Sequence, residues 1–147
     1  MADEPRIRPM TEQDAGDVAA LSTQLGYPAS APEVQRRFFG VVRASAGVVF
    51  VAESAGGAVV GWLHVFGLHL LETAPFAEIG ALVVDRDARR GGVGRALIVA
   101  AERWAREAGY GAIRVRSNTV RTAARPFYEA RGYELIKTQY VFQKALD

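Results

Sequence analysis

The sequence predicts one α/β domain in which helices are inserted among the strands of a single sheet. The chain has 147 residues, 50% of them hydrophobic and 23% charged, which suits one domain with a full core. Short β-branched or apolar runs alternate with longer segments of helical periodicity. No linker, internal repeat or low-complexity stretch divides the chain. The expected order is β-α-α-β-β-β-α-β-α-β, with a break in the last strand.

The first quarter of the chain predicts a short strand and two helices. The strand is Arg6–Met10. A capping motif, Thr11–Asp14, then opens an apolar repeat of helical spacing that ends at Gly26. Tyr27 and the proline after it break this pattern. A second capped start at residues 30–33 begins another helix, whose apolar face runs to residue 42.

Three strands follow. Val48–Glu53 is β-branched and is joined by the turn residues 54–57 to its expected hairpin partner, Ala58–Phe66. Phe76–Val84 is almost continuously apolar, as expected for a strand that is buried on both faces. The central part of the sheet is therefore assigned to residues 48–84.

The last third of the chain predicts two more helices and two or three strands. An apolar stripe begins at residue 93 and marks a long helix closed by Gly109. Ala112–Arg116 alternates apolar and basic residues as a strand. Arg121–Arg131 is a helix that ends before a glycine, and Tyr133–Leu146 is strand-like with a break near residue 138.

Composition excludes several classes of site. There is no cysteine, so disulfides, zinc thiolate sites and a cysteine nucleophile are absent. No apolar run approaches ~18 residues and the first residues are acidic, so we expect a cytoplasmic protein without a membrane partner. The net charge is only +2, and the arginines crowd one loop instead of forming a long stripe. We therefore expect a local anion site and no nucleic acid.

That loop is the strongest candidate site. Gly91, Gly92 and Gly94 lie between a buried strand and the first turn of a helix, where glycine lets the backbone approach a ligand and free N–H groups point toward it. The positive end of the helix dipole adds to this anion cradle. Arginines add charge around it, at positions Arg89, Arg90 and Arg95. The alternative is that the glycines only turn the chain and cap the helix.

Two common phosphate-binding templates do not fit the loop. A P-loop needs Gly-Lys followed by Ser or Thr, whereas Gly94 is followed by Arg95 and Ala96. A dinucleotide fingerprint that starts at Gly92 meets Leu97 where Gly or Ala should stand. The loop therefore belongs to neither template.

The loop resembles that of the GNAT superfamily of N-acetyltransferases. Arg89-x-x-Gly92-x-Gly94 matches the family's Arg/Gln-x-x-Gly-x-Gly/Ala signature, and Ala81–Asp85 is similar to the strand before it. Asn118, two alanines at 123 and 124, and Phe127–Tyr133 resemble the family's later motif. The resemblance covers nearly the whole chain. It implies a mixed, mostly antiparallel sheet of 6–7 strands, splayed after the fourth strand and flanked by about four helices.

The resemblance also implies a cosubstrate, acetyl-CoA, and no metal. Loop amides from Arg90 to Arg95, including that of Val93, would bind the pyrophosphate, with Arg89 beside them. The strand residues Leu82, Val83 and Val84 would pair with the pantetheine arm, although their side chains also suit core packing. Asn118 would contact the coenzyme, or alternatively cap a helix.

Two residues match catalytic positions of the family. Tyr128 corresponds to the tyrosine that protonates the leaving thiolate; its alternative role is packing beside Phe127. Glu78 lies in a Phe-Ala-Glu-Ile context and would be the base, directly or through water; otherwise it reaches solvent or an arginine. His64 is the reserve base, and His69 is expected in a loop.

The acceptor is less defined by the sequence. Candidate lining residues are Tyr27, Trp62, His64 and Leu71, each of which also suits ordinary packing. Without an obvious nucleophile, direct attack of a small-molecule primary amine on acetyl-CoA is expected. Protein N-acetylation, a non-catalytic acyl-CoA sensor and an unrelated nucleotide-binding module remain alternatives. The resemblance further implies a homodimer, formed through Tyr140–Leu146.

Overall fold

The computed structural model describes residues 4–44, 46–89 and 91–147. The chain divides into two compact units, Met1–Arg116 and Ser117–Asp147. The first unit contains the sheet and three helices. The second contains one short helix, α4 (Ala124–Glu129), followed by a long segment without regular structure.

A five-stranded sheet in the order β1-β2-β3-β4-β5 forms the centre of the first unit. Its strands are β1 (Arg6–Pro9), β2 (Gly47–Glu53), β3 (Val59–Leu68), β4 (Phe76–Val84) and β5 (Ile113–Val115). Neighbouring strands are antiparallel, except for β4 and β5, which are parallel. The expectation of a mixed, mostly antiparallel sheet is confirmed.

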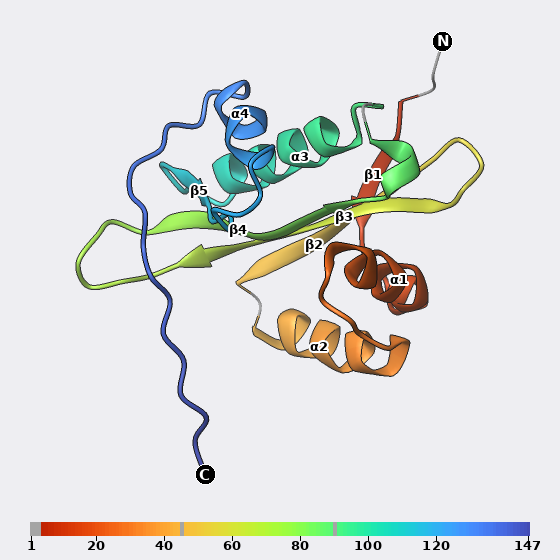
Figure 1. Ribbon diagram of the computed structural model, residues 1–147, viewed down its shortest axis with the longest axis horizontal. Helices are drawn as coiled ribbons and strands as arrows, with labels where there is room; N and C mark the ends of the chain where they lie inside the picture. The colour runs from red at the N-terminus through yellow and green to blue at the C-terminus, as the bar shows by residue number, and fades with distance from the viewer. Residues whose placement is uncertain (1–3, 45, 90) are drawn as a thin grey trace. The chain divides into compact units, whose positions relative to one another are not determined.

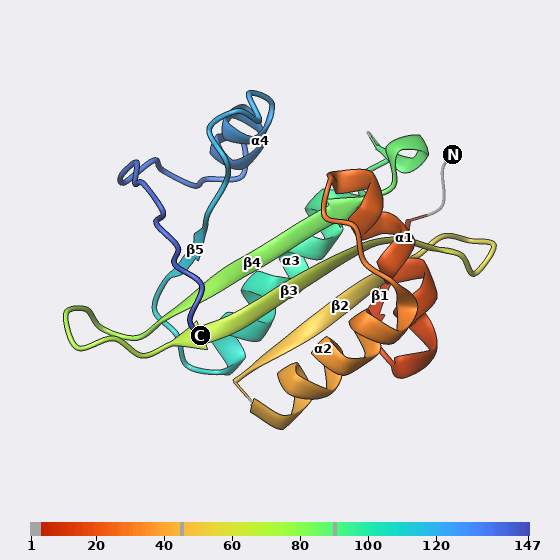
Figure 2. The same ribbon diagram turned by 60° about the horizontal axis from the view of Figure 1, so that its bottom comes forward.

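Helices cover both faces of this sheet. α1 (Ala15–Leu25) and α2 (Ala31–Ala44) lie on one face and α3 (Val93–Glu107) lies on the other, as Figures 1 and 2 show. Gly26 ends α1 in the left-handed conformation, with φ of 99°, as its position after the apolar repeat predicts. Two 3-10 turns, Glu12–Asp14 and Arg86–Ala88, precede α1 and α3.

The number of strands is smaller than the expected 6–7. The segment 133–146 was expected to be a strand, yet it forms none, and no sixth strand exists among the described residues. A strand needs a neighbour to satisfy its N–H and C=O groups, and the described part of the second unit holds no other strand. Large apolar side chains of this segment are consequently exposed, including Tyr140, Val141 and Phe142 at 87–90%. The homodimer through this segment stays a prediction.

The splay after the fourth strand also differs from expectation. β5 is only three residues long and pairs with Ala77–Ile79 of β4. The rest of β4, Gly80–Val84, has no second strand beside it among the described residues. The sheet is therefore open here because β5 ends, not because two long strands diverge.

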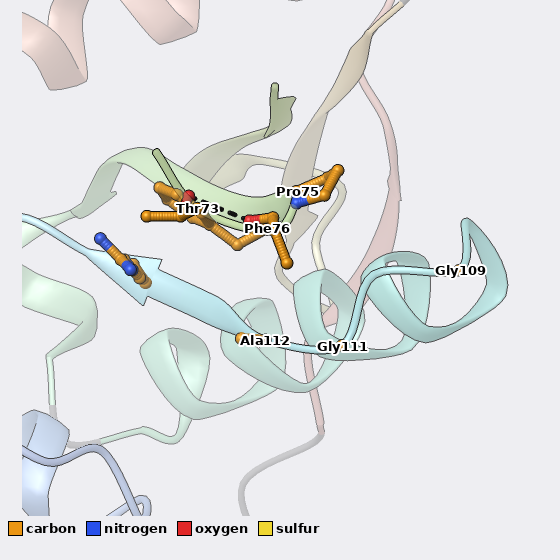
Figure 3. A pocket seen from close by; sticks show the side chains of 8 residues that line it. Thr73, Pro75, Phe76, Gly109, Gly111 and Ala112 are labelled. Atoms are coloured by element: carbon orange, nitrogen blue, oxygen red, sulfur yellow. Dashed lines mark hydrogen bonds between the residues drawn. The ribbon is translucent and has the colours of Figure 1, made fainter. Parts of the chain in front are cut away.

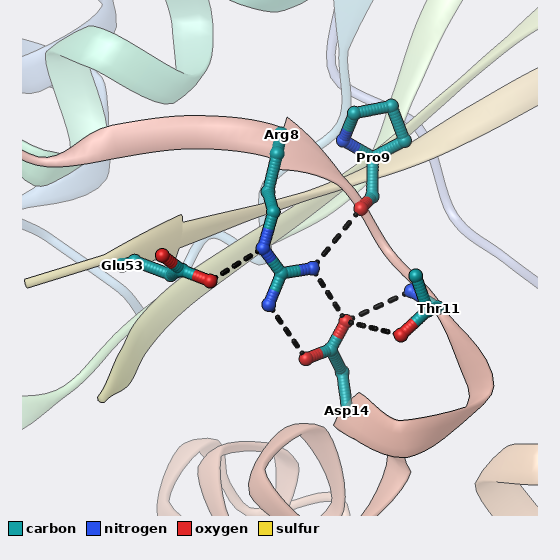
Figure 4. A network of polar contacts seen from close by, with 5 residues as sticks. All are labelled: Arg8, Pro9, Thr11, Asp14 and Glu53. Atoms are coloured by element: carbon teal, nitrogen blue, oxygen red, sulfur yellow. Dashed lines mark hydrogen bonds and ion pairs between the residues drawn. The ribbon is translucent and has the colours of Figure 1, made fainter. Parts of the chain in front are cut away.

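An arginine ties the N-terminal strand to the start of α1 (Figure 4). The Arg8 guanidinium donates to both carboxylate oxygens of Asp14, at 2.8 and 2.9 Å, and also to Glu53 on β2. Asp14 also accepts from the Thr11 backbone N–H at 2.8 Å, which closes the predicted capping box. The hydrogen bond from Arg8 is the main cause that lowers the pKa of Asp14 below its ordinary value of 3.8.

This network predicts acid-dependent stability. A depressed carboxyl pKa contributes stability that is present above the unfolded pKa and lost as pH falls through the folded pKa. We expect Asp14→Asn to lower the free energy of unfolding by about 1–2 kcal/mol at pH 7 and to flatten its fall below about pH 4. Urea unfolding at several pH values measures both effects. The exposed Asp17, replaced by Asn, is the control, and an equal loss in the two variants would contradict the prediction.

Candidate active site

The glycine-rich loop forms the N-terminus of α3. Asp85 directly follows β4, and its side chain accepts a 3.0 Å hydrogen bond from the Asp87 N–H at the start of the 3-10 turn. Gly92 caps α3 with φ of 80°, a left-handed conformation that favours glycine. The Ala96 N–H donates to the Gly92 carbonyl at 3.0 Å, which is the first hydrogen bond of the helix. The N–H groups of residues 93–95 come before it in the chain. Such amides have no helical acceptor and are suited to bind an anion.

A second glycine fixes how closely α3 approaches the sheet. A Cβ atom at Gly61 of β3 would lie 2.9 Å from Val93 Cγ1 and 3.2 Å from Leu97 Cδ1. Both contacted side chains are buried in the first turns of α3. The missing side chain therefore lets the helix start rest directly on β3. Gly61 thereby sets the position of the loop.

Two of the three arginines around the loop lie in the described part of the chain. Arg89 and Arg95 are exposed, and neither takes part in an ion pair within the described ranges. Arg90 lies outside the described residues. The two described guanidinium groups add to the positive end of the α3 dipole.

The edge of β4 offers backbone groups for a ligand. Leu82 and Val84 are half-buried and Val83 is 2% exposed, so their side chains pack in the fold. The edge of Gly80–Val84 that faces away from β3 has no strand partner among the described residues. Its N–H and C=O groups can therefore pair with an extended ligand while the side chains fill the core.

Register shows which side chains share a face of the sheet. Gly61 faces α3, whereas the neighbouring Trp62 packs against the apolar cluster under α1 and α2. Alternation then puts His64 and Phe66 on the α1/α2 face as well. Phe66 is paired with Glu78 across the strands, so Glu78 lies on this face too. The structure thus brings the base candidates Glu78 and His64 to one face of two adjacent strands.

Glu78 is buried and bonded to an arginine. It is 7% exposed, and its Oε1 accepts a 3.0 Å hydrogen bond from Arg116 Nε. Arg116 follows β5 and its side chain is about half exposed, at 55%. The contact matches the alternative that Glu78 reaches an arginine. It also orients the carboxylate next to the point where the open edge of β4 begins.

His64 is held in a tight aromatic contact. Its ring centroid lies 5.0 Å from that of Phe66. Burial lowers the pKa of His64, so the imidazole is neutral at pH 7 and can accept a proton. Gly80 leaves room for the Phe66 ring, since a Cβ atom there would lie 2.7 Å from Phe66 Cε1, whereas its 3.6 Å distance to His64 Nδ1 would be an ordinary contact.

The remaining acceptor candidates do not form a shared pocket in the structure. Tyr27 is 60% exposed after α1, and the Leu71 side chain is fully exposed in the β3–β4 loop. Trp62 packs against the core cluster, but its indole N–H is buried and has no acceptor in the described part of the chain. Of these three, only Trp62 shares the strand and the face of His64.

Asn118 and Tyr128 belong to the second unit. The Asn118 side chain accepts from the Val120 N–H at 3.1 Å and so stabilises a turn. Because Ala123 is the N-cap of α4, the expectation that Asn118 caps that helix is wrong. Tyr128 contacts Phe127 and Tyr133 edge-to-face, at 5.1 and 5.8 Å between centroids. Burial raises the pKa of its phenol, and the charge of Arg121 opposes this shift.

Sequence reasoning did not single out Arg116, Gly61 or Gly80. The signal for Arg116 was present in the alternation of apolar and basic residues from Ile113 to Arg116. This alternation puts both arginines on the same face of the strand. The two glycines gave no such signal, because their role depends on neighbours that are distant in sequence.

The described residues contain neither a cluster of metal ligands nor a helix that could span a membrane. No group of three or more His, Asp or Glu side chains there could hold a metal ion. None of the described helices combines the length and apolar character needed to cross a bilayer.

Known structures share the fold of this chain. An aminoglycoside N-acetyltransferase solved in complex with CoA superposes with a TM-score of 0.86 at 18% identity, covering 99% of this chain and 98% of that one. A transcriptional regulator from Bacillus halodurans gives a TM-score of 0.84 at 22% identity, covering 95% and 99%. At these identities the likeness establishes the acetyltransferase-type fold and not a substrate.

Sequence comparison gives the family. The model of the acetyltransferase (GNAT) family matches residues 17–133, well over half of the chain, and the chain belongs to this family. A curated relative, an aminoglycoside N(6′)-acetyltransferase type 1 of Stenotrophomonas maltophilia, is 28% identical over 100% of this chain and 97% of its own length. The protein is an N-acetyltransferase, and its acyl donor is acetyl-CoA.

The loop geometry predicts a separable effect on coenzyme binding. Gly92→Val blocks the approach of a pyrophosphate to the loop amides, so we expect the Kd of CoA to rise at least tenfold, measured by calorimetric titration. The left-handed φ of 80° also makes valine strained, at a cost of about 1–2 kcal/mol.

Gly57→Val provides a matched control. Gly57 has φ of 85° and, like Gly92, has open space where a Cβ atom would stand, but it lies in the β2–β3 turn. The two variants should lose similar stability, and only the Gly92 variant should lose CoA binding. Equal binding by both would show that the loop does not hold the pyrophosphate.

Proposed function

We propose that the protein transfers the acetyl group directly from acetyl-CoA to a primary amine of a small molecule, within a ternary complex. The observation that carries this proposal is the juxtaposition of the open β4 edge with the buried Glu78 at the point where β5 pairing begins. The chain contains no cysteine, so the commonest acyl-enzyme nucleophile is missing. Direct transfer needs only that both reactants are held in line.

The proposed donor site begins at the α3 loop and continues along β4. Backbone amides of residues 90–95 bind the pyrophosphate, with Arg89 and Arg95 neutralising its charge. The unpaired edge of Leu82–Val84 pairs with the pantetheine arm. Because β5 occupies this edge at Ala77–Ile79, the arm must end near Gly80, beside Glu78. We propose that Asn118 also contacts the coenzyme.

Glu78 is proposed as the base. An alkylammonium with a pKa near ~10 must lose a proton before its nitrogen can attack the thioester carbonyl. Glu78 takes this proton directly or through one water, while Arg116 holds the carboxylate in place. The nitrogen then forms a C–N bond to the carbonyl carbon, and the C–S bond breaks as the thiolate leaves. The nitrogen loses its second proton as the amide forms, and this proton balances the one that the leaving thiolate takes up to become the thiol of CoA.

Tyr128 is proposed to donate to the leaving sulfur. Burial raises its pKa, so the phenol keeps its proton at neutral pH and is present as a donor. An ordinary tyrosine, with a pKa of ~10, is already a weaker acid than a thiol at ~8.5. A hydrogen bond from the Tyr128 phenol therefore stabilises the developing thiolate before the phenol proton is transferred to the sulfur.

The small-molecule acceptor is supported by the curated relative, whose name gives an aminoglycoside as its substrate. Trp62 and His64 are the proposed lining residues on the sheet, and Tyr27 and Leu71 on the loops around it. The alternative is N-acetylation of a protein, which assays with small-molecule and protein acceptors would distinguish.

The choice of base can be tested by substitution. We expect Glu78→Gln to lower kcat/KM by about 10²–10⁴-fold. His64→Gln is the matched comparison and should cause a smaller loss of activity. The readout is release of CoA thiol with a panel of amines. A larger loss in the His64 variant than in the Glu78 variant would assign the base to His64.

The role of Tyr128 predicts a loss in turnover. Tyr128→Phe keeps the aromatic contacts and removes the donor, so we expect kcat to fall by about 10²-fold with little change in CoA affinity. Steady-state kinetics and a CoA titration separate the two effects. If neither this variant nor Glu78→Gln changed thiol release, the chain would be better described as an acyl-CoA sensor.

A further inference from the structure

A hollow of about 540 Å³ lies at the end of β4 that is remote from the coenzyme loop (Figure 3). It is walled by the β3–β4 loop with Thr73 and Pro75, by Phe76 at the start of β4, and by the segment from α3 into β5. This volume is sufficient for a small ligand. Among the described residues that line it, Arg114 alone is charged.

The Arg114 guanidinium is held against an aromatic ring and forms no ion pair within the described part of the chain. Its central carbon lies 3.9 Å from the centroid of the Phe76 ring. None of the ion pairs among the described residues involves Arg114. A guanidinium that stacks on a ring keeps its in-plane N–H donors available, and their fork matches an oxyanion.

Arg114 is also adjacent to the proposed base. It is the register partner of Glu78 across the parallel β4–β5 pair, where strands lie about 4.8 Å apart. Side chains of register partners leave the same face of a sheet, so the guanidinium and the carboxylate are neighbours. An amine at Glu78 is therefore within a few bond lengths of an anion at Arg114.

The local charge argues against a polycationic acceptor. Arg114 on β5 is the register partner of Glu78, and Arg116, just after β5, already bonds to Glu78. Several ammonium groups would thus meet two guanidinium groups and a single, paired carboxylate. An amine that carries its own anionic group instead complements both charges.

We propose, resting on the acetyltransferase function above, that the acceptor is a zwitterionic amine: a primary amine with a carboxylate or phosphonate a few bonds away. Arg114 binds the oxyanion, Phe76 orients the guanidinium, and the amine faces Glu78. Arg114 is thereby a specificity-determining residue of the acceptor site.

Matched acceptors test this proposal on the full-length protein with acetyl-CoA. The pairs are an ω-amino acid against its carboxamide, and 2-aminoethylphosphonate against ethanolamine, with a polycationic aminoglycoside as a further arm. We expect kcat/KM for the anionic member to exceed that of its neutral partner by roughly ten- to hundredfold. The two pairs decide between carboxylate and phosphonate.

Variants assign the preference to its residue. Arg114→Gln should abolish the preference, Arg114→Lys should retain part of it, and Arg103→Gln, an exposed arginine on α3, should leave it unchanged. Thermal melting checks that each variant is folded. Equal rates on both members of each pair, a preference for the aminoglycoside, or a preference that survives in Arg114→Gln would overturn the inference. Absence of thiol release with every amine would instead refute the proposed function itself.

Discussion

The change in pairing along β4 is the constraint on which the site depends. From Ala77 to Ile79 the strand is paired on both edges, and from Ala81 onward β3 is its only partner among the described residues. A sheet edge with unpaired N–H and C=O groups in the middle of a fold demands a partner. In the proposed donor site, the pantetheine arm of acetyl-CoA would supply this partner.

The two glycines Gly61 and Gly80 support this arrangement from opposite faces. Gly61 lets the first turn of α3 rest on β3, which brings the amides of the helix start close to the end of β4. Gly80 leaves space for the ring of Phe66 on the other face, beside His64. On each face, the absence of one side chain fixes how closely the neighbouring groups pack.

Local patterns in the sequence were sufficient to predict most helices and strands of the first unit. Alternation, capping motifs and glycine stops placed β1 to β4 and α1 to α3 within a few residues, and Phe76–Val84 agreed with the observed strand at both ends. The loop was identified because its chemistry is contiguous in sequence. The contact of Glu78 with Arg116 spans 38 residues, and no local pattern encodes such a pairing. The segment after residue 132 was wrongly assigned as a strand, because its apolar composition specifies β-propensity but not a neighbour.

The pairing between β3 and β4 shifts by one residue, from His64 opposite Ala81 to Val65 opposite Ile79, which leaves Gly80 as an extra residue. This bulge resets the inside-outside alternation of the strand. If the same residues continued in unbroken alternation from Ala81, Phe76 and Glu78 would turn toward α3, and the carboxylate would face the protein interior beneath that helix. The extra residue at the bulge therefore lets Glu78 share the face of Ala81 and Val83, although it is an odd number of positions away from them in the chain.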